Sequence, residues 1–325
     1  MGMDQQAAPT TNVPAMAMQA VRGFCMGVAD IVPGVSGGTI ALIFGIYHRL
    51  IANVRMGAKA LGSLVKLDLR SAIERVKAIE WTFIVPLLAG VVIAVVSLSH
   101  FIEGLLDDYP EEMAGVFLGL VAASVIIAWK QVESWSNETY AILGVVAVAA
   151  FILLGFQSGA IADPSPLQFF GAGAIAICAM ILPGISGSFL LLMMGMYAGL
   201  LGAVNEREIP DVAIFMVGAV IGLALFSTLL SWMLEHHSDR VLAAIIGLMV
   251  GSARVLWPWP NGVGVISDEE DEVVKGTDLG WADDAASFIW PTALAVAAFL
   301  AVWGISVYGE RRIAARAGRA EAVNA

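Results

Sequence analysis

Residues 31–47 read IVPGVSGGTIALIFGIY, and residues 181–197 read ILPGISGSFLLLMMGMY. At a constant offset of 150 residues the two stretches share the motif Pro-Gly-x-Ser-Gly and, further on, a Gly and a Tyr. Chance rarely places so many identical residues in one register twice. The match therefore indicates an internal repeat, in which the chain consists of two related halves.

Each copy of the motif lies in an apolar run that it must interrupt. Pro33 has no amide proton and clashes with the preceding turn, while Gly34 and Gly37 permit positive φ. At 1.5 Å per residue, residues 17–32 and 38–51 would form helices of about 24 Å and about 21 Å, against about 30 Å of hydrocarbon. Neither helix spans a bilayer comfortably. Each copy therefore predicts a re-entrant helical hairpin whose tip reaches the middle of the membrane. A hairpin whose two helices both cross the membrane is the open alternative.

The composition is that of an all-α polytopic membrane protein. Hydrophobic residues make up 59% of the 325 residues and charged residues 14%, and the mean hydropathy is +0.83. Cys25 and Cys178 both lie in apolar segments, which favours buried thiols over a disulfide or a metal site. We expect no metal, no cofactor and no nucleic-acid partner, and the oligomeric state is left open.

The order of segments is the same in the two halves. Residues 1–16 lack the basic region of a signal peptide, and we expect them to form a short retained tail. Repeat 1 covers residues 17–156, with a hairpin at 17–51, an amphipathic helix at 52–80 and spans at 81–105, 112–130 and 138–156. Repeat 2 covers residues 157–308, with a hairpin at 167–203, spans at 211–234, 240–257 and 287–308, and then a tail at 309–325. Three spans is an odd number, so the second half enters the membrane from the opposite side. This order predicts two inverted-topology repeats.

The cationic residues support this orientation. If residues 1–16 are cytoplasmic, the outer side holds only Arg207, Arg254 and Lys275. The cytoplasmic segments and their flanks hold the other fourteen: Arg22, Arg49, Arg55, Lys59, Lys66, Arg70, Arg75, Lys77, Lys130, Arg240, Arg311, Arg312, Arg316 and Arg319. The positive-inside rule therefore predicts a multi-pass protein of the cytoplasmic membrane with both termini in the cytoplasm.

Two segments outside the spans are unusual. In residues 52–80, Lys59, Lys66, Arg70 and Lys77 recur at helical spacing beside an apolar face. Such a helix either lies on anionic head groups or is a solvated linker that obeys the positive-inside rule. The outer loop at 258–286 contains the acidic run 268–272, which favours a solvated or unstructured loop. Its role is left open.

The hairpin tips are where chemistry is expected. A helix that begins at each tip would point its unpaired amides and its positive dipole end into the membrane centre. Two such starts that face one another would form an anion pocket for a phosphate or a carboxylate. The alternative is that the motif serves only the packing of a broken helix. The candidate phosphate-binding residues are Gly34, Ser36, Gly37, Gly38, Thr39, Gly184, Ser186, Gly187 and Ser188, with Arg22 at the cytoplasmic mouth.

Asp30 is the ionisable residue closest to a tip, and its counterpart in the second half is Met180. Ionisable groups at membrane depth usually have a function. One interpretation is a coupling group that is protonated and deprotonated during transport. The other is a side chain that caps the amides of Ser36 or Gly37.

The first motif, Gly27-Val28-Ala29-Asp30-Ile31-Val32-Pro33-Gly34-Val35-Ser36-Gly37-Gly38-Thr39, resembles a bacterial and archaeal membrane family catalogued as domain of unknown function 368. Members of that family are identified as polyprenyl-phosphate translocases. The resemblance implies the return of undecaprenyl phosphate to the cytoplasmic leaflet for reuse in cell-envelope synthesis, with polyprenyl phosphate and membrane phospholipids as partners. The second motif lacks the Asp and the Gly-Gly-Thr, so a role that needs those groups falls on the first half.

Two other classes remain open. A secondary transporter of a small anionic solute would use the same repeat and pocket. A lipid phosphatase would need a nucleophile with a base, and Ser36 has Asp30 nearby but no histidine at the depth of the motif. We therefore expect a protein that is not an enzyme.

Overall fold

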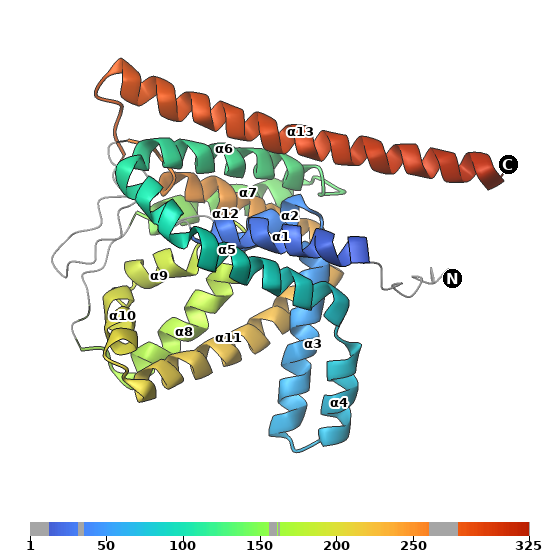
Figure 1. Ribbon diagram of the computed structural model, residues 1–325, viewed down its shortest axis with the longest axis vertical. Helices are drawn as coiled ribbons and strands as arrows, with labels where there is room; N and C mark the ends of the chain where they lie inside the picture. The colour runs from blue at the N-terminus through green and yellow to red at the C-terminus, as the bar shows by residue number, and fades with distance from the viewer. Residues whose placement is uncertain (1–12, 32–35, 156–160, 162, 260–278, 325) are drawn as a thin grey trace.

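The computed structural model describes residues 13–31, 36–155, 161, 163–259 and 279–324, and in these residues the regular structure is entirely helical (Figure 1). The residues of the N-terminal tail before Val13, Gly34 of the first tip and the acidic run 268–272 lie outside the described residues.

The first half contains α1 (Val13–Ile31), α2 (Gly37–Ile43), α3 (Tyr47–Val65), α4 (Leu69–Ala78), α5 (Trp81–Asp108), α6 (Pro110–Trp129) and α7 (Asn137–Leu153). The second half contains α8 (Pro166–Ile181), α9 (Gly187–Met193), α10 (Tyr197–Asn205), α11 (Ile209–His236), α12 (Ser238–Gly251), a 3-10 turn at Ser252–Arg254 and α13 (Ala285–Asn324).

Helix starts follow local sequence signals. Ser136 and Thr139 form a capping box at α7, in which each side chain accepts a hydrogen bond from the backbone amide of the other residue. Pro110 and Pro166 stand in the first turns of α6 and α8, where no intrahelical amide bond is lost. The apolar runs that follow therefore begin as helices at defined residues.

Four described helices are long and apolar enough to cross a membrane, namely α5, α6, α11 and residues 285–307 of α13. They coincide with four of the six expected spans, so the prediction of an all-α polytopic membrane protein agrees with the structure. The other two expected spans are shorter helices, because α7 has 17 residues and α12 has 14. At 1.5 Å per residue α12 extends only about 21 Å. Most of its apolar side chains are buried inside the protein, although Val250 is exposed.

The expected single helix over residues 38–51 is wrong, because the chain breaks again at residues 44–46. The amide of Gly45 donates to Leu42 O at 3.0 Å and that of Ile46 to Ala41 O at 2.9 Å. Gly45 has φ +66°, as the glycine of this helix-ending motif requires. Gly195 repeats the turn with φ +69°, and α9 and α10 meet at 108°. The glycine shared by both motif copies is the signal for this break.

The expected amphipathic helix over residues 52–80 is also two helices. The helix α3 continues from the hairpin to Val65, and α4 returns after a turn at residues 66–68. Arg75 ties them together, since its Nη1 donates to Lys59 O and to Ser63 Oγ, each at 2.7 Å. Asp68 caps α4 by accepting a hydrogen bond from the amide of Ser71 at 3.1 Å. The segment is therefore an antiparallel helical hairpin.

The same close helix contact occurs in both halves. The helix α1 packs on α5, and α8 packs on α11. A Cβ on Gly23 would lie 1.9 Å from the carbonyl oxygen of Leu87, and one on the equivalent Gly173 would lie 2.1 Å from that of Phe215. Without the glycines, these backbones could not approach one another so closely.

The helices at the other expected spans pair across the two halves. The helix α6 packs on α13, and α12 packs on α7. A Cβ on Gly119 would lie 2.0 Å from Ala295 O, and one on Gly251 would lie 2.8 Å from Ala147 O. The helix at the second expected span of each half therefore packs on the helix at the third expected span of the other half, and the two halves form one intertwined bundle.

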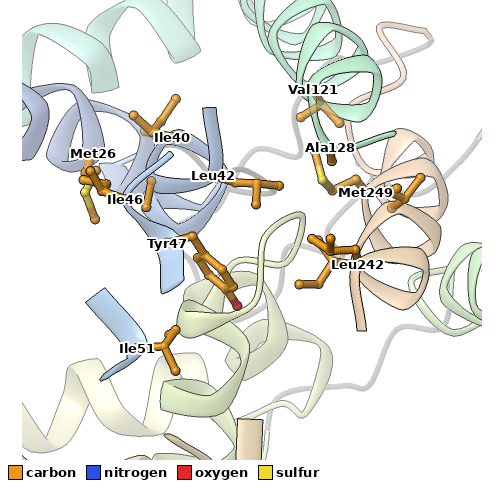
Figure 2. Packing of buried hydrophobic residues seen from close by; sticks show 14 of the residues in the cluster. Met26, Ile40, Leu42, Ile46, Tyr47, Ile51, Val121, Ala128, Leu242 and Met249 are labelled. Carbon is orange, nitrogen blue, oxygen red and sulfur yellow. The ribbon is translucent and has the colours of Figure 1, made fainter. Parts of the chain in front are cut away.

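The main apolar core lies where the first hairpin meets α6, α11 and α12. Tyr47 is 1% exposed and stands between Leu42 and Ile46 of the first hairpin and Leu242 and Met249 of α12 (Figure 2). The hairpin is thus packed into the bundle rather than attached to its surface.

The glycine contacts generate a stability prediction. Gly218 packs on α8, where a Cβ would lie 2.1 Å from Phe170 O, whereas a Cβ on Gly144 would have no neighbour within 4 Å. We expect Gly218→Val to destabilise the protein by about 1–3 kcal/mol through overpacking. Gly144→Val carries the same change in helix propensity and serves as the control. Equal midpoints of thermal unfolding for the two variants in detergent micelles would contradict this prediction.

Candidate functional site

The two motif copies are in direct contact. Ser36 Oγ donates to Met180 O at 3.0 Å, and Tyr47 OH donates to Ile181 O at 3.2 Å. In the other direction, the amide of Gly184 donates to Thr39 Oγ1 at 3.0 Å. The last carbonyls of a helix have no intrahelical partner, so side chains of the first half complete the end of α8. We call these three bonds the tip contacts.

The amides at the start of α2 are occupied by the protein's own side chains. Asp30 Oδ1 accepts from the amide of Gly37 at 2.6 Å, and Ser36 Oγ accepts from that of Gly38 at 3.1 Å. The amide of Thr39 donates to Ser36 O at 2.9 Å. Asp30 therefore has the geometry of the capping interpretation. A Cβ on Gly37 would lie 2.6 Å from Asp30 Oδ2, so glycine allows this approach.

The start of α9 is different, because Met180 stands where the first half has Asp30. A Cβ on Gly187 would lie 2.5 Å from Met180 Cγ, and a thioether is at best a weak acceptor. No described residue accepts a hydrogen bond from the amides of Gly187, Ser188 or Phe189. The Ser186 and Ser188 hydroxyls lie 2.8 Å apart and bond to one another. The amides at the start of α9 thus stay open to a ligand, whereas the matching amides at the start of α2 are bound by Asp30 and Ser36.

A cavity of about 240 Å³ lies against these donors. Its polar lining comes from Asp30, Ser36, Ser186 and Ser188. Its walls are small or apolar residues of α8, α9 and α11: Gly173, Ala176, Met180, Leu191, Phe215 and Ala219. This volume is below the roughly 300–1,000 Å³ of most ligand pockets, which suits a compact polar group rather than a long chain.

The structure brings together most of the residues predicted from the sequence. Asp30, Ser36, Ser186, Gly187 and Ser188 line the cavity. Behind it, where the tips meet, are Gly37, Gly38, Thr39 and Gly184. Gly34 lies outside the described residues.

Arg22 does not join this cluster. It lies eight residues before Asp30 on α1, which is about 12 Å along a helix. Its Nη1 donates to Gln19 Oε1 at 3.2 Å, and the side chain is half-buried. Arg22 could therefore contact a phosphate only near the end of the bundle, and not one bound in the cavity.

A neighbouring cation, Arg49, is already neutralised. Its Nε donates to Glu80 Oε2 at 3.0 Å, and its guanidinium lies 4.3 Å from the centre of the Phe83 ring. The hydrogen bond from Arg49 holds the pKa of Glu80 below its usual range. Asn53 Nδ2 also donates to Glu80, at 3.1 Å. This ion pair fixes the start of α3 to the start of α5.

Sequence reasoning missed the walls of the cavity and the role of Tyr47. Tyr47 and Tyr197 match in register, so the signal was present, but the partner of the hydroxyl lies 134 residues away. Cys25 and Cys178 are free, half-buried thiols. In the described part of the chain, no group of three His, Cys, Asp or Glu side chains could hold a metal ion.

Known proteins resemble this chain over most of its length. The family described as Undecaprenyl phosphate translocase-like matches residues 26–274. A protein of Vibrio cholerae named "Polyprenyl-phosphate transporter" is 39% identical over 240 residues, which is 74% of this chain and 77% of the relative. A protein of Staphylococcus aureus with the same name is 30% identical over 256 residues, covering 73% of this chain and 85% of the relative. No solved structure matches the chain.

The tip contacts can be tested at a single amide. Thr39→Val leaves the buried amide of Gly184 without its acceptor, whereas Thr39→Ser keeps the hydroxyl. A buried unsatisfied group costs about 1–3 kcal/mol, or roughly a 5- to 150-fold change in an opening equilibrium. We expect hydrogen exchange around Gly184 to accelerate by such a factor in Thr39→Val and little in Thr39→Ser. The same exchange rate in both variants would show that the contact contributes nothing.

Proposed function

The chain belongs to the Undecaprenyl phosphate translocase-like family, and we propose that it carries a polyprenyl phosphate such as undecaprenyl phosphate across the cytoplasmic membrane without changing it chemically. The observation that carries this proposal is the cavity of about 240 Å³ at the meeting point of two broken helices. Its hydroxyls and open amides are donors suited to a phosphate. The transport would return the carrier lipid for reuse in cell-envelope synthesis.

The phosphate would replace its hydration with donors of the second motif. A charged head group taken into hydrocarbon without hydrogen bonds would meet a prohibitive cost. The Ser186 and Ser188 hydroxyls and the amides of residues 187–189 could donate to its oxygens. The cavity has room for this head group, and the tail would remain in lipid along the exposed apolar side chains of α8 and α11, which include Ile175, Met180 and Met216.

We further propose that the two halves, residues 17–156 and 157–308, are inverted repeats that open in turn. The cavity lies beside the α8–α11 pair. On the equivalent α1–α5 pair, a Cβ on Gly27 would lie 2.7 Å from Val91 O. In a second arrangement the α1–α5 side would open to the other leaflet and the α8–α11 side would close. The tip contacts would hold the present arrangement, and both termini would be cytoplasmic, in keeping with the distribution of cationic residues.

Asp30 is proposed to couple this cycle to protons. Its carboxyl group lines the same cavity as Ser186 and Ser188. A carboxylate and a phosphate at short distance repel one another, so one of them would take up a proton when the lipid binds and release it on the other side. Met180 cannot do this, which makes the coupling a property of the first half.

The small volume of the cavity also suits a second candidate function, the transport of a small anionic solute. Such a transporter would need the same donors but no lipid tail. The two functions differ in whether an anion without a tail is moved.

Transport can be measured in proteoliposomes that contain undecaprenyl phosphate, by following how much lipid an impermeant external phosphatase can reach over time. Each hydrogen bond to a charged group contributes about 1.5–3 kcal/mol, so we expect Ser186→Ala/Ser188→Ala to slow exposure of the inner pool by roughly tenfold or more. Ser97→Ala, an exposed serine on α5, should match the wild type. A wild type that behaves like empty liposomes would remove the lipid proposal, and uptake of inorganic phosphate would then test the solute transporter.

The coupling proposal has its own assay. With a pH gradient across the proteoliposomes, we expect the wild type to shift the distribution of the lipid between leaflets. Asp30→Asn cannot exchange the proton and should equilibrate the lipid without a response to the gradient. An equal response in both proteins would exclude Asp30 as the coupling group, even if transport itself is confirmed.

A further inference from the structure

The helical hairpin α3–α4 is held at one end of the bundle. Arg55 of α3 pairs with Glu235 and donates to Ser231 Oγ at 2.9 Å, both near the C-terminal end of the span α11. The second helix is attached as well, because near the C-terminal end of α4 Trp81 Nε1 donates to Val76 O at 2.9 Å, where the span α5 begins. Both attachments are at the ends of spans, so the hairpin departs from one membrane surface and returns to it. Figure 1 shows it running across the direction of α1, α5 and α13.

One side of this hairpin is apolar and uncovered. Leu69, Ile73 and Val76 are spaced as one face of α4, and Leu69 and Ile73 are 63% and 55% exposed. The two helices are antiparallel and pack through Ala72 of α4 and residues 60 and 63 of α3. Given this contact, the helical spacing places Leu64 of α3 on the same side of the hairpin as the apolar face of α4. Leu64 is also exposed. Side chains of this size in a contiguous patch mark a surface that meets something apolar.

The turn of the hairpin adds a second, independent observation. Leu67 has φ 59°, the left-handed conformation that glycine or asparagine usually supplies at the end of a helix. Its side chain is 86% exposed. A leucine here is unfavourable both for the backbone and in water, so neither folding nor solubility accounts for it.

Cationic residues border the apolar side. Lys66 lies in the turn, and Arg70 and Lys77 lie on the edge of α4 away from α3; all three are exposed. Arg70 is 3.5 Å from Glu74, but both side chains are largely exposed, so this pair neutralises little. The protein has a net charge of −11, and a local excess of cations beside an apolar face is the pattern of a helix in the membrane interface.

We propose that α3–α4 is an anchor on the membrane surface, with Leu64, Leu67, Leu69, Ile73 and Val76 in the boundary between head groups and acyl chains. Lys66, Arg70 and Lys77 would bind the phosphates of anionic phospholipids. The excess of cations at this end of the bundle assigns the anchor to the cytoplasmic leaflet. This role does not depend on which substrate the cavity takes, and a transport failure would leave it untouched.

The test uses the full-length protein with Cys25→Ala and Cys178→Ala, and one new cysteine for an environment-sensitive fluorophore. The probes are Ile73→Cys and Leu67→Cys on the apolar side and Lys59→Cys as the control on the opposite side. The labelled proteins are reconstituted into phosphatidylcholine vesicles with and without phosphatidylglycerol, and with lipids that carry a quencher near the head group. Elution as a single species in detergent verifies folding before reconstitution.

We expect blue-shifted emission and lipid quenching at positions 67 and 73 but not at 59. With phosphatidylglycerol present, Lys66→Gln/Arg70→Gln/Lys77→Gln should weaken the quenching, since each cation near an anionic surface contributes about a fivefold factor to association. Equal quenching at 59 and 73 would overturn the anchor. Blue-shifted emission at 73 without lipid quenching would also overturn it, because the apolar side would then be covered by a second copy or another protein.

Discussion

A helix that ends inside a hydrocarbon layer leaves amides and carbonyls that water cannot reach, and each must find a partner within the protein. If the tips lie in the membrane as proposed, the chain meets this constraint at the end of α8. The last carbonyls of α8 accept hydrogen bonds from Ser36 and Tyr47, and the amide of Gly184 is bound by Thr39. These partners come from the first half of the chain, so the second tip is not satisfied by its own half alone. The breaks therefore hold the two halves together.

Glycine contacts set how the rest of the bundle assembles around the tips. Between helices in lipid there is little hydrophobic driving force, and close backbone packing takes its place. The pairs α1–α5 and α8–α11 form within each half, whereas α6–α13 and α7–α12 form between the halves. The first kind of pair carries the tips. The second kind joins the two halves, and in the proposed alternating cycle the tip-carrying pairs would move as units against it.

The repeat itself explains how much of this could be predicted from the sequence. The register of Pro33 with Pro183 and of Ser36 with Ser186 located the breaks and brought the site residues to attention. Gly45 and Gly195 marked the second break equally well, but an unbroken apolar run obscured it. The expected span at 240–257 stays a prediction, because α12 is short and burial in protein and burial in lipid select the same apolar residues. The turn at residues 66–68 was missed because the cationic spacing continues across it. The partners of Ser36 and Tyr47 depend on tertiary contacts that no local pattern encodes.

The differences between the two copies matter as much as their similarity. In the first copy, Asp30 and Ser36 occupy the amides at the start of α2, so that tip is closed. In the second copy, Met180 replaces the aspartate, and Ser188 replaces Gly38. The same backbone then keeps its donors open towards the cavity and gains a hydroxyl beside them. The two copies thus contain broken helices of one design. A few substitutions leave the first tip closed by its own side chains and the second tip with open donors. An anion bound there, as proposed, would need no fixed cation, whose burial in the membrane would itself be unfavourable.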